Sequence, residues 1–462
     1  MIPLECQQVA RMAQGHLLQG HPERKVTGVS TDTRSVQPGD VFVALRGDRF
    51  DGHEFIESAM RKGALAVIVD RPFNKGTLPE SMAVIKVNDT LVALQRWASA
   101  YRQTLSVRIA AVTGSNGKTS TKEMMRCSLG ARWNTSGTKG NLNNHIGVPL
   151  TLLSIEENTE WMVMEMGMNH AGELRPLVEM AKPDLAVITG IGWAHIEHLG
   201  SREAIAEEKM EVVRSLPAHG FALISGNDPL LQPLPSKTAA KVIKAGWVEG
   251  CEMRGNSLQV EGGGMTFDCY FGGESTSVFL PIHGKHMASN ALLALAAATV
   301  SGVRLQSAAD ALRHLKLPGS RLKRIPWGGG VLIDDSYNAS PDSVMAGVET
   351  LILLPDKGRR VLLLGGMAEL GVMSVELHEW VGQQVVRLGV DLLGLYGPYS
   401  EDTLRGALNA GMQRDRVGMF SDHESLAKWY EQKRADGDVV LVKGSRAMKM
   451  EILIENLTGK GE

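Results

Sequence analysis

An α/β fold with mostly parallel sheets, divided among about three domains, is predicted from the order of apolar runs along the chain and from its length. Short β-rich runs such as ALAVIVD near 64, WMVMEMG near 161 and VLLLGG near 361 alternate with helical patterns, which is the rhythm of βαβ units. The chain has 462 residues, and roughly 100–200 residues per domain gives about three domains.

Two changes of pattern indicate the domain boundaries. The strand MAVIKV gives way to a helical run just after residue 88, and Pro318 and Gly319 interrupt the chain after an alanine-rich helix. Proline and glycine in such a position mark a break between elements. We therefore expect three domains, at residues 1–88, 89–316 and 317–462.

The charge balance argues against a general attraction for nucleic acid or anionic membranes. Lysine and arginine total 49 against 51 acidic residues, and the four cysteines show no C-x-x-C pair. The longest apolar run, ALLALAAATV from Ala291, is shorter than the roughly 20 residues that span a bilayer. We expect a soluble cytoplasmic monomer with small-molecule substrates, no nucleic-acid partner and no membrane insertion.

The stretch AAVTGSNGKTSTKEMM, beginning at Ala110, predicts a nucleotide-binding loop. It joins a buried-strand pattern to a helix through a glycine turn, so backbone N–H groups at the helix start would face an anion. Lys118 would reach the outer phosphates, and the Thr119 hydroxyl would ligate Mg²⁺. Val112 stands where the usual pattern has a glycine, so a plain strand-to-helix turn stays open. The expected phosphate-binding residues are Gly114, Ser115, Asn116, Gly117, Lys118 and Thr119.

Three ionisable residues follow later strands or lie in a helix nearby. Glu165 ends an apolar strand just before Gly167, where a carboxylate can face a ligand beyond the strand ends. His195 lies beyond another strand, and Lys209 lies in an otherwise acidic helix. The alternatives are a capping or ion-paired Glu165, a hydrogen-bonded polar His195, and a Lys209 that pairs along a solvated helix face.

Together with four longer motifs, these elements resemble the Mur ligases, the ATP-dependent amide-forming enzymes of peptidoglycan precursor synthesis. The motifs are STDTRSVQPGDVFVALRGDRFDGHEF, NLNNHIGVPLTLL, DDSYNASP and LVKGSRAMKME. The family's loop has the short form T-G-x-x-G-K-[TS], which accounts for Val112. The resemblance implies a small N-terminal α/β domain, a central P-loop ATPase-like domain with a parallel sheet, and a C-terminal Rossmann-like domain.

The resemblance also implies a reaction. It is strongest to the ligase that joins D-alanyl-D-alanine to UDP-N-acetylmuramoyl-tripeptide (UDP-MurNAc-tripeptide) through an acyl phosphate, giving the UDP-pentapeptide, ADP and phosphate. The neighbouring ligase that adds the third amino acid typically carries D-N-P-R and D-Y-A-H-T-P, and neither string occurs in this chain. Whether the tripeptide ends in diaminopimelate or lysine is not disclosed.

Residue by residue, the family's motifs assign two magnesium sites. Thr119 and Glu165 would organise one ion between the β- and γ-phosphates. His195 and Lys209 would organise a second, with Lys209 carbamylated so that it acts as a carboxylate. The catalytic residues implied by the resemblance are Lys118, His195, Lys209 and Arg321.

Three residues match the family's other nucleotide contacts. Asn290 would contact adenine, Asp335 would receive the ribose, and Arg321 would reach the γ-phosphate from the third domain. The alternatives are a helix cap, a turn carboxylate and a surface arginine. Ser320 interrupts the family's usual G-R pair, which leaves Arg324 open as the arginine that reaches phosphate.

The remaining substrate contacts are assigned to polar loops. By resemblance, the turn with Ser30, Asp32 and Arg34 holds the uridine diphosphate end of the acceptor, although Asp32 and Arg34 could instead form a local ion pair. Asn143 and Asn144 suit the sugar–peptide portion or the acyl phosphate, and a loop-stabilising Asx turn is their alternative.

Two departures and two alternative functions remain. Met287 replaces the first asparagine of the family's G-x-H-N-x-x-N, and LGGMAELG has Gly366 where aspartate is frequent, so no role is assigned to that loop. A folylpolyglutamate synthase would share the nucleotide loop but gives no place to the N-terminal D-T-R block. A nucleotide-dependent regulatory switch would hydrolyse ATP without any acceptor.

Overall fold

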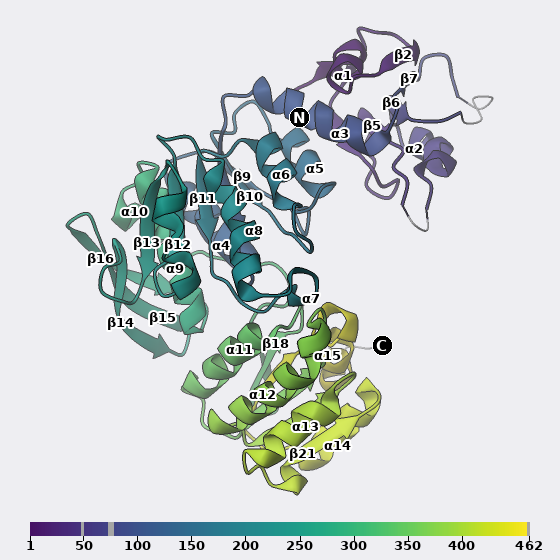
Figure 1. Ribbon diagram of the computed structural model, residues 1–462. Helices are drawn as coiled ribbons and strands as arrows, with labels where there is room; N and C mark the ends of the chain where they lie inside the picture. Colours follow the sequence, from purple (N-terminus) through teal and green to yellow (C-terminus); the bar gives the residue numbers. More distant parts are fainter. Residues whose placement is uncertain (48–49, 73–77, 460–462) are drawn as a thin grey trace.

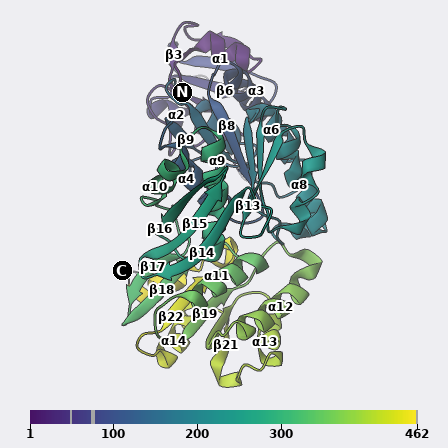
Figure 2. The ribbon, with the colours of Figure 1, turned by 90° about the vertical axis from the view of Figure 1, so that its left-hand side faces the viewer.

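Three large β-sheets follow one another along the chain, and helices pack against each of them (Figures 1 and 2). The computed structural model describes residues 1–47, 50–72 and 78–459. The body around the central sheet lies between the other two in Figure 1. This confirms the predicted α/β fold with three domains, while the boundaries after residues 88 and 316 stay predictions.

The first sheet has five strands in the order β2-β7-β6-β5-β4, with β2 and β7 antiparallel and the other neighbours parallel. Alternate residues of the run AVIV in β6 face two different cores, because successive side chains of a strand point to opposite faces. The elements are β1 (Leu4–Glu5), α1 (Cys6–Met12), β2 (His16–Gln19), β3 (Lys25–Val26), β4 (Gly28–Ser30), β5 (Asp40–Val43), η1 (Gly52–Phe55), α2 (Ile56–Arg61), β6 (Ala66–Val69), β7 (Ala83–Lys86) and the connecting α3 (Thr90–Gln103).

The central sheet has nine strands in the order β16-β15-β14-β13-β12-β11-β8-β10-β9. All neighbours from β14 to β9 in this order, including β8, are parallel. Strand β15 pairs antiparallel with both β14 and β16, and the turns of these two hairpins lie at EGGG and FGGES. The elements are β8 (Arg108–Thr113), α4 (Lys118–Leu129), β9 (Thr135–Gly137), α5 (Gly147–Leu153), β10 (Trp161–Glu165), α6 (Leu174–Ala181), β11 (Leu185–Ile188), α7 (Ile196–Leu199), α8 (Arg202–Arg214), β12 (Phe221–Ser225), η2 (Pro229–Leu231), η3 (Leu234–Lys237), β13 (Lys241–Gly246), β14 (Met253–Glu261), β15 (Gly264–Phe271), β16 (Glu274–Leu280), α9 (Lys285–Val300) and α10 (Leu305–Leu312).

The third sheet has six strands in the order β17-β18-β22-β19-β20-β21, and its neighbours are parallel except for β17 and β18. The last strand of the chain therefore lies in the middle of the sheet. The elements are β17 (Lys323–Trp327), β18 (Gly330–Asp335), α11 (Pro341–Leu353), β19 (Arg360–Gly365), η4 (Gly371–Met373), α12 (Ser374–Arg387), β20 (Leu392–Tyr396), α13 (Ser400–Asn409), η5 (Arg414–Arg416), β21 (Val417–Phe420), α14 (His423–Lys433), β22 (Val439–Lys443), η6 (Arg446–Met448) and α15 (Glu451–Thr458).

Strand direction decides where the polar loops meet. Strands β8, β10 and β11 are parallel neighbours, so the segments after Thr113, Glu165 and Ile188 leave the same edge of the sheet. Ligands bind at this edge in open α/β sheets. Of the helices that the structure describes, none has both the length and the apolar character needed to cross a membrane.

Helix α3 attaches the start of the chain to the central domain. The ring of Tyr101 is fully buried. Its hydroxyl accepts a hydrogen bond from the Ile2 backbone N–H at 2.8 Å and donates one to the Ile155 carbonyl at 2.8 Å. One side chain thus satisfies two backbone groups from segments more than 150 positions apart in the chain.

Tyr101→Phe is expected to destabilise the first two domains by about 1–3 kcal/mol, because it leaves buried backbone groups without partners. Differential scanning calorimetry would measure the loss. Tyr270→Phe is the matched control, since the Tyr270 ring is partly exposed. Equal melting temperatures for the two variants would contradict the assigned role of the Tyr101 hydroxyl.

Candidate active site

The loop between β8 and α4 wraps around its own lysine. Lys118 Nζ donates to the Gly114 carbonyl at 2.6 Å and to the Ser115 carbonyl at 3.2 Å. Gly117 has a φ of 81°, and a Cβ there would lie 2.8 Å from Asn290 Nδ2, so this position needs glycine. The first N–H groups of α4 have no partner within the helix and are available to an anion. The geometry is that of a phosphate-binding loop.

Burial lowers the pKa of the Lys118 amine, and Arg321 adds to this effect, while the carboxylates of Glu165 and Glu369 oppose it. Two cations and two carboxylates therefore lie within electrostatic range of each other at the loop. Three of these groups come from the sequence prediction, and Glu369 does not. A bound phosphate would add the negative charge that favours both cations.

Thr119 and Glu165 meet as predicted. The Thr119 hydroxyl donates to Glu165 Oε2 at 2.9 Å, and Asn143 Nδ2 donates to Glu165 Oε1 at 2.9 Å. Hydroxyl and carboxylate oxygens are the hard ligands that Mg²⁺ prefers. Within the part of the chain that the structure describes, no group of three or more His, Cys, Asp or Glu side chains could hold a metal. The pair fits Mg²⁺ only if phosphate oxygens or water complete the coordination.

The side chain of Lys209 lies on the buried face of α8 and not on its solvent-exposed face. Its relative exposure is 1%, so a lysine that pairs along a solvated helix face is the wrong alternative. Burial lowers the pKa of Lys209 well below its ordinary value, the positive charge of Lys118 lowers it further, and Glu208 opposes the shift. The shift favours the uncharged amine more than in a lysine exposed to water.

A carboxylate from the third domain contacts His195. The Nδ1 atom of His195 lies 2.5 Å from Glu369 Oε2, although within the described residues it has no hydrogen bond of good angular geometry. The contact lowers the pKa of the Glu369 carboxyl. No role was assigned to the LGGMAELG loop from sequence, but its place after the carboxyl end of β19 could have indicated one.

Arg321 is the arginine that lies at the phosphate loop. Its Nη2 atom is 3.3 Å from the Thr119 hydroxyl oxygen, and its guanidinium carbon lies 4.1 Å from the centre of the Tyr337 ring. Arg324 instead donates two hydrogen bonds of 3.0 Å to Asp356. Arg321 therefore lies beside the loop and Arg324 is paired with Asp356, while the arginine that reaches the γ-phosphate stays a prediction.

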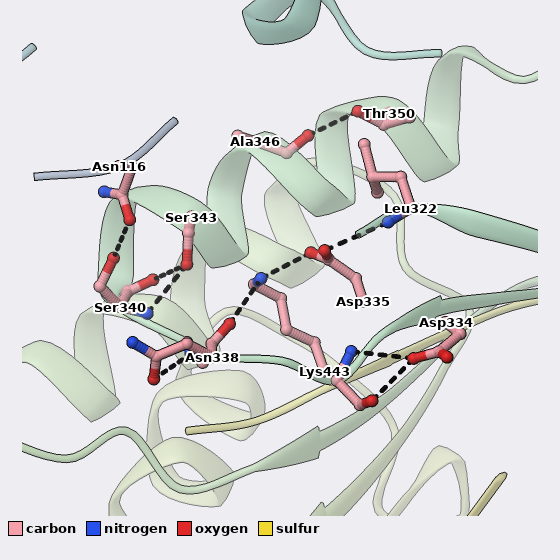
Figure 3. A network of polar contacts seen from close by, with 12 residues as sticks. Asn116, Leu322, Asp334, Asp335, Asn338, Ser340, Ser343, Ala346, Thr350 and Lys443 are labelled. Atoms are coloured by element: carbon pink, nitrogen blue, oxygen red, sulfur yellow. Dashed lines mark hydrogen bonds and ion pairs between the residues drawn. The ribbon is translucent and has the colours of Figure 1, made fainter. Parts of the chain in front are cut away.

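Asp335 is the last residue of β18 and forms a buried ion pair. Lys443 Nζ lies 2.5 Å from Asp335 Oδ2 and donates to the Asn338 carbonyl at 3.0 Å (Figure 3). Burial raises the pKa of Asp335, and Lys443 opposes this shift. Sequence reasoning missed Lys443, although Asp335 and Lys443 are register partners at the ends of neighbouring strands.

Asn290 and Met287 both lie on α9. Asn290 is buried against Gly117 of the phosphate loop, so it is inside the candidate nucleotide site. Met287 is also buried and belongs to the apolar core. The replacement of the family's first asparagine therefore adds an apolar contact at this position.

The predicted substrate loops show local contacts. Arg34 donates to both carboxylate oxygens of Asp32, at 3.0 and 2.6 Å, which is the local ion pair left open above. The Ser30 hydroxyl donates to the Asp32 carbonyl at 2.8 Å. Asp48 and Arg49, in the same motif, lie outside the described residues.

Asn143 and Asn144 have different roles in the structure. Asn143 holds Glu165, as described above. The Asn144 side-chain oxygen accepts hydrogen bonds from the backbone N–H groups of Ile146 and Gly147. Asn144 thus forms the Asx turn that was its alternative.

Comparison with known proteins gives a consistent match along the chain. Sequence models of the Mur ligase family match at residues 25–102 (catalytic domain), 112–298 (middle domain) and 320–446 (glutamate ligase domain). UDP-N-acetylmuramoyl-tripeptide–D-alanyl-D-alanine ligase of Bacillus subtilis strain 168 is 40% identical over 459 residues, covering 99% of each chain.

Solved structures agree with this match. The crystal structure of MurF from Acinetobacter baumannii superimposes with a TM-score of 0.90 at 29% identity and covers 99% of both chains. MurF from Thermotoga maritima in complex with ADP gives a TM-score of 0.82 at 28% identity, covering 94% of this chain and 98% of that one.

Asp335→Ala is expected to destabilise the third domain by about 3–5 kcal/mol, because it leaves the buried Lys443 charge without its partner. The double variant Asp335→Ala/Lys443→Met should recover most of that loss. Urea denaturation followed by circular dichroism would measure both. Asp32→Ala, which removes an exposed ion pair, is the control and should cause no measurable loss. A stable single variant at Asp335 would contradict the importance of the ion pair.

Proposed function

The chain belongs to the Mur ligase family, and we propose that within this family it is the ATP-dependent ligase that joins D-alanyl-D-alanine to UDP-MurNAc-tripeptide. The observation that carries the proposal is the convergence of Glu165 and Arg321 on Thr119 of the phosphate loop. This arrangement joins a carboxylate of the central domain to a cation of the third domain at the place where phosphate would lie. The named function of the Bacillus subtilis relative supports the choice of substrates.

The chemistry follows from the poor reactivity of a carboxylate. Hydroxide is a bad leaving group, so the terminal carboxylate of the tripeptide first takes the γ-phosphoryl group of ATP. Alignment and charge neutralisation dominate the catalysis of such a transfer, and Lys118 and Arg321 supply positive charge at the loop. The amine of D-alanyl-D-alanine then attacks the acyl phosphate, and phosphate leaves through a tetrahedral intermediate.

Two Mg²⁺ ions are part of this proposal. Thr119 and Glu165 would hold one ion, and His195 with a carbamylated Lys209 would hold the other. Bound Mg²⁺ would withdraw charge from the phosphate oxygens. The carbamate forms when the uncharged Lys209 amine attacks CO₂ and releases one proton, and the burial of Lys209 favours that uncharged amine.

The other contacts stay proposals of the same kind. Asn290 and Asp335 would contact adenine and ribose, and the turn with Ser30, Asp32 and Arg34 would receive the uridine diphosphate. Asn143 would act through Glu165. A cytoplasmic location and a monomeric state complete the proposal, since ATP and the nucleotide-linked precursor are intracellular metabolites.

Phosphate release from ATP is expected to require UDP-MurNAc-tripeptide and D-alanyl-D-alanine together, because the site activates one substrate for attack by the other. A coupled phosphate assay with each substrate omitted in turn would measure this. Mass spectrometry of the UDP-pentapeptide is the control for amide formation. Rapid hydrolysis of ATP alone would favour a nucleotide-dependent switch and overturn the ligase.

Lys209→Ala is expected to slow acyl phosphate formation by about 10²–10³, as for the loss of one electrostatic stabiliser. Lys209→Arg should be similarly slow, because arginine keeps the positive charge and does not form a carbamate. Acetate should restore part of the activity of the alanine variant. The kinetics of both proteins at matched Mg²⁺ and matched melting temperature check this, and ¹³C NMR with labelled bicarbonate detects the carbamate directly. Native turnover by Lys209→Arg would rule the carbamate out.

A further inference from the structure

The first turn of α11, from the third domain, lies against two loops of the nucleotide site. The Ser340 hydroxyl donates to Asn116 Oδ1 of the phosphate loop at 3.1 Å (Figure 3). Two residues later, Asp342 Oδ2 accepts the backbone N–H of Trp193 at 2.7 Å. Trp193 belongs to the segment that follows β11 and carries His195. One helix start therefore contacts both the loop that precedes Lys118 and the loop that precedes His195.

The Asp342 carboxylate is stabilised in this contact by its neighbours. Burial raises the pKa of the Asp342 carboxyl, and the hydrogen bond from Trp193 and the charge of Arg202 oppose that shift. Arg202 itself donates to the Ile191 carbonyl at 2.8 Å. A carboxylate taken out of water costs free energy unless it is well hydrogen-bonded. The Trp193 N–H and the charge of Arg202 therefore stabilise the Asp342 carboxylate in this position.

Gly192 provides the space for the contact. A Cβ at Gly192 would lie 2.3 Å from Asp342 Oδ2 and 3.3 Å from Asn116 Nδ2. Gly192 is not among the glycines with positive φ, so alanine fits the backbone conformation there. The absence of a side chain at this position serves the close approach of Asp342 rather than the turn.

We propose that Ser340 and Asp342 are positioning residues that hold the third domain against the loops at 114–117 and 190–195, so that Arg321 reaches the phosphates. We call their contacts with Asn116, Gly192 and Trp193 the α11 contact. The inference rests on the proposed ligase function, because Arg321 is assigned there to the γ-phosphate. Ser340 and Asp342 are not among the residues assigned to substrate. The loss of their contacts would therefore change how the third domain is held against the loops.

Four variants and a control test the α11 contact in the full-length protein. Asp342→Asn removes the charge, Asp342→Ala removes the carboxylate, Gly192→Ala displaces it by steric overlap, and the double variant Gly192→Ala/Asp342→Ala combines the last two changes. Asp422→Asn is the matched control, because Asp422 caps α14 in the same domain through the Ser425 N–H at 2.7 Å.

We expect the kcat of ligation to fall at least about tenfold in Asp342→Ala and Gly192→Ala, as for a lost hydrogen bond to a charged group. The loss should be smaller in Asp342→Asn, because its amide oxygen can still accept the Trp193 N–H. The dissociation constant for UDP-MurNAc-tripeptide and the melting temperature should match those of Asp422→Asn. The double variant should be close to Asp342→Ala, because the shortest contact of the added Cβ, at 2.3 Å, is with the carboxylate, and the 3.3 Å contact with Asn116 is what remains after its removal. A kcat equal to that of the control in both Asp342→Ala and Gly192→Ala would overturn the proposal. So would a melting temperature that falls while kcat is kept.

Small-angle scattering with ADP and UDP-MurNAc-tripeptide tests the contact without catalysis. The wild-type protein should be more compact than Asp342→Ala and Gly192→Ala, and Asp422→Asn should match the wild type. Equal radii of gyration in all of these proteins would overturn the α11 contact. Different radii in a wild-type protein that forms no amide would instead overturn the proposed ligase function alone and uphold the contact.

Discussion

The hydrogen bond between Thr119 and Glu165 fixes the point around which the other charged groups are arranged. It ties the first turn of α4 to the carboxyl end of β10, so the positive end of a helix and the edge of a parallel sheet meet at one place. Asn143 holds the second oxygen of Glu165, and Arg321 reaches the same threonine from the third domain. Asn143 and Arg321 thus both contact one member of this hydrogen-bonded pair.

The electrostatics of the site favour an anionic ligand. Burial disfavours the charged forms of Lys118 and Lys209, which also repel one another. Glu165 and Glu369 offset part of this unfavourable charge. A bound phosphate would place further negative charge beside Lys118 and Arg321. The positions of Lys118 and Arg321 therefore favour the binding of an anion at the loop.

Local sequence pattern predicted the phosphate loop and its neighbouring strand ends, and the family resemblance predicted that Arg321 lies near the loop. Several other contacts between distant segments were missed. The β8–loop–α4 unit and the strand-end position of Glu165 follow from periodicity and turn chemistry. The contacts of Glu369 with His195, Lys443 with Asp335 and Asp342 with Trp193 join residues 108 to 174 positions apart. No local propensity encodes such pairs. Asn144, whose partners lie two and three residues away, followed the local alternative instead.

The strand order of the third sheet has a consequence for folding during synthesis. Strand β22 lies between β18 and β19, so the middle of this sheet stays open until β22 has left the ribosome. The first two sheets use only earlier segments and are complete before that. In the nascent chain, β18 and β19 present unpaired edges. A chain that stops before Val439 would contain every strand of the first two sheets, while β18 and β19 would each keep one unpaired edge.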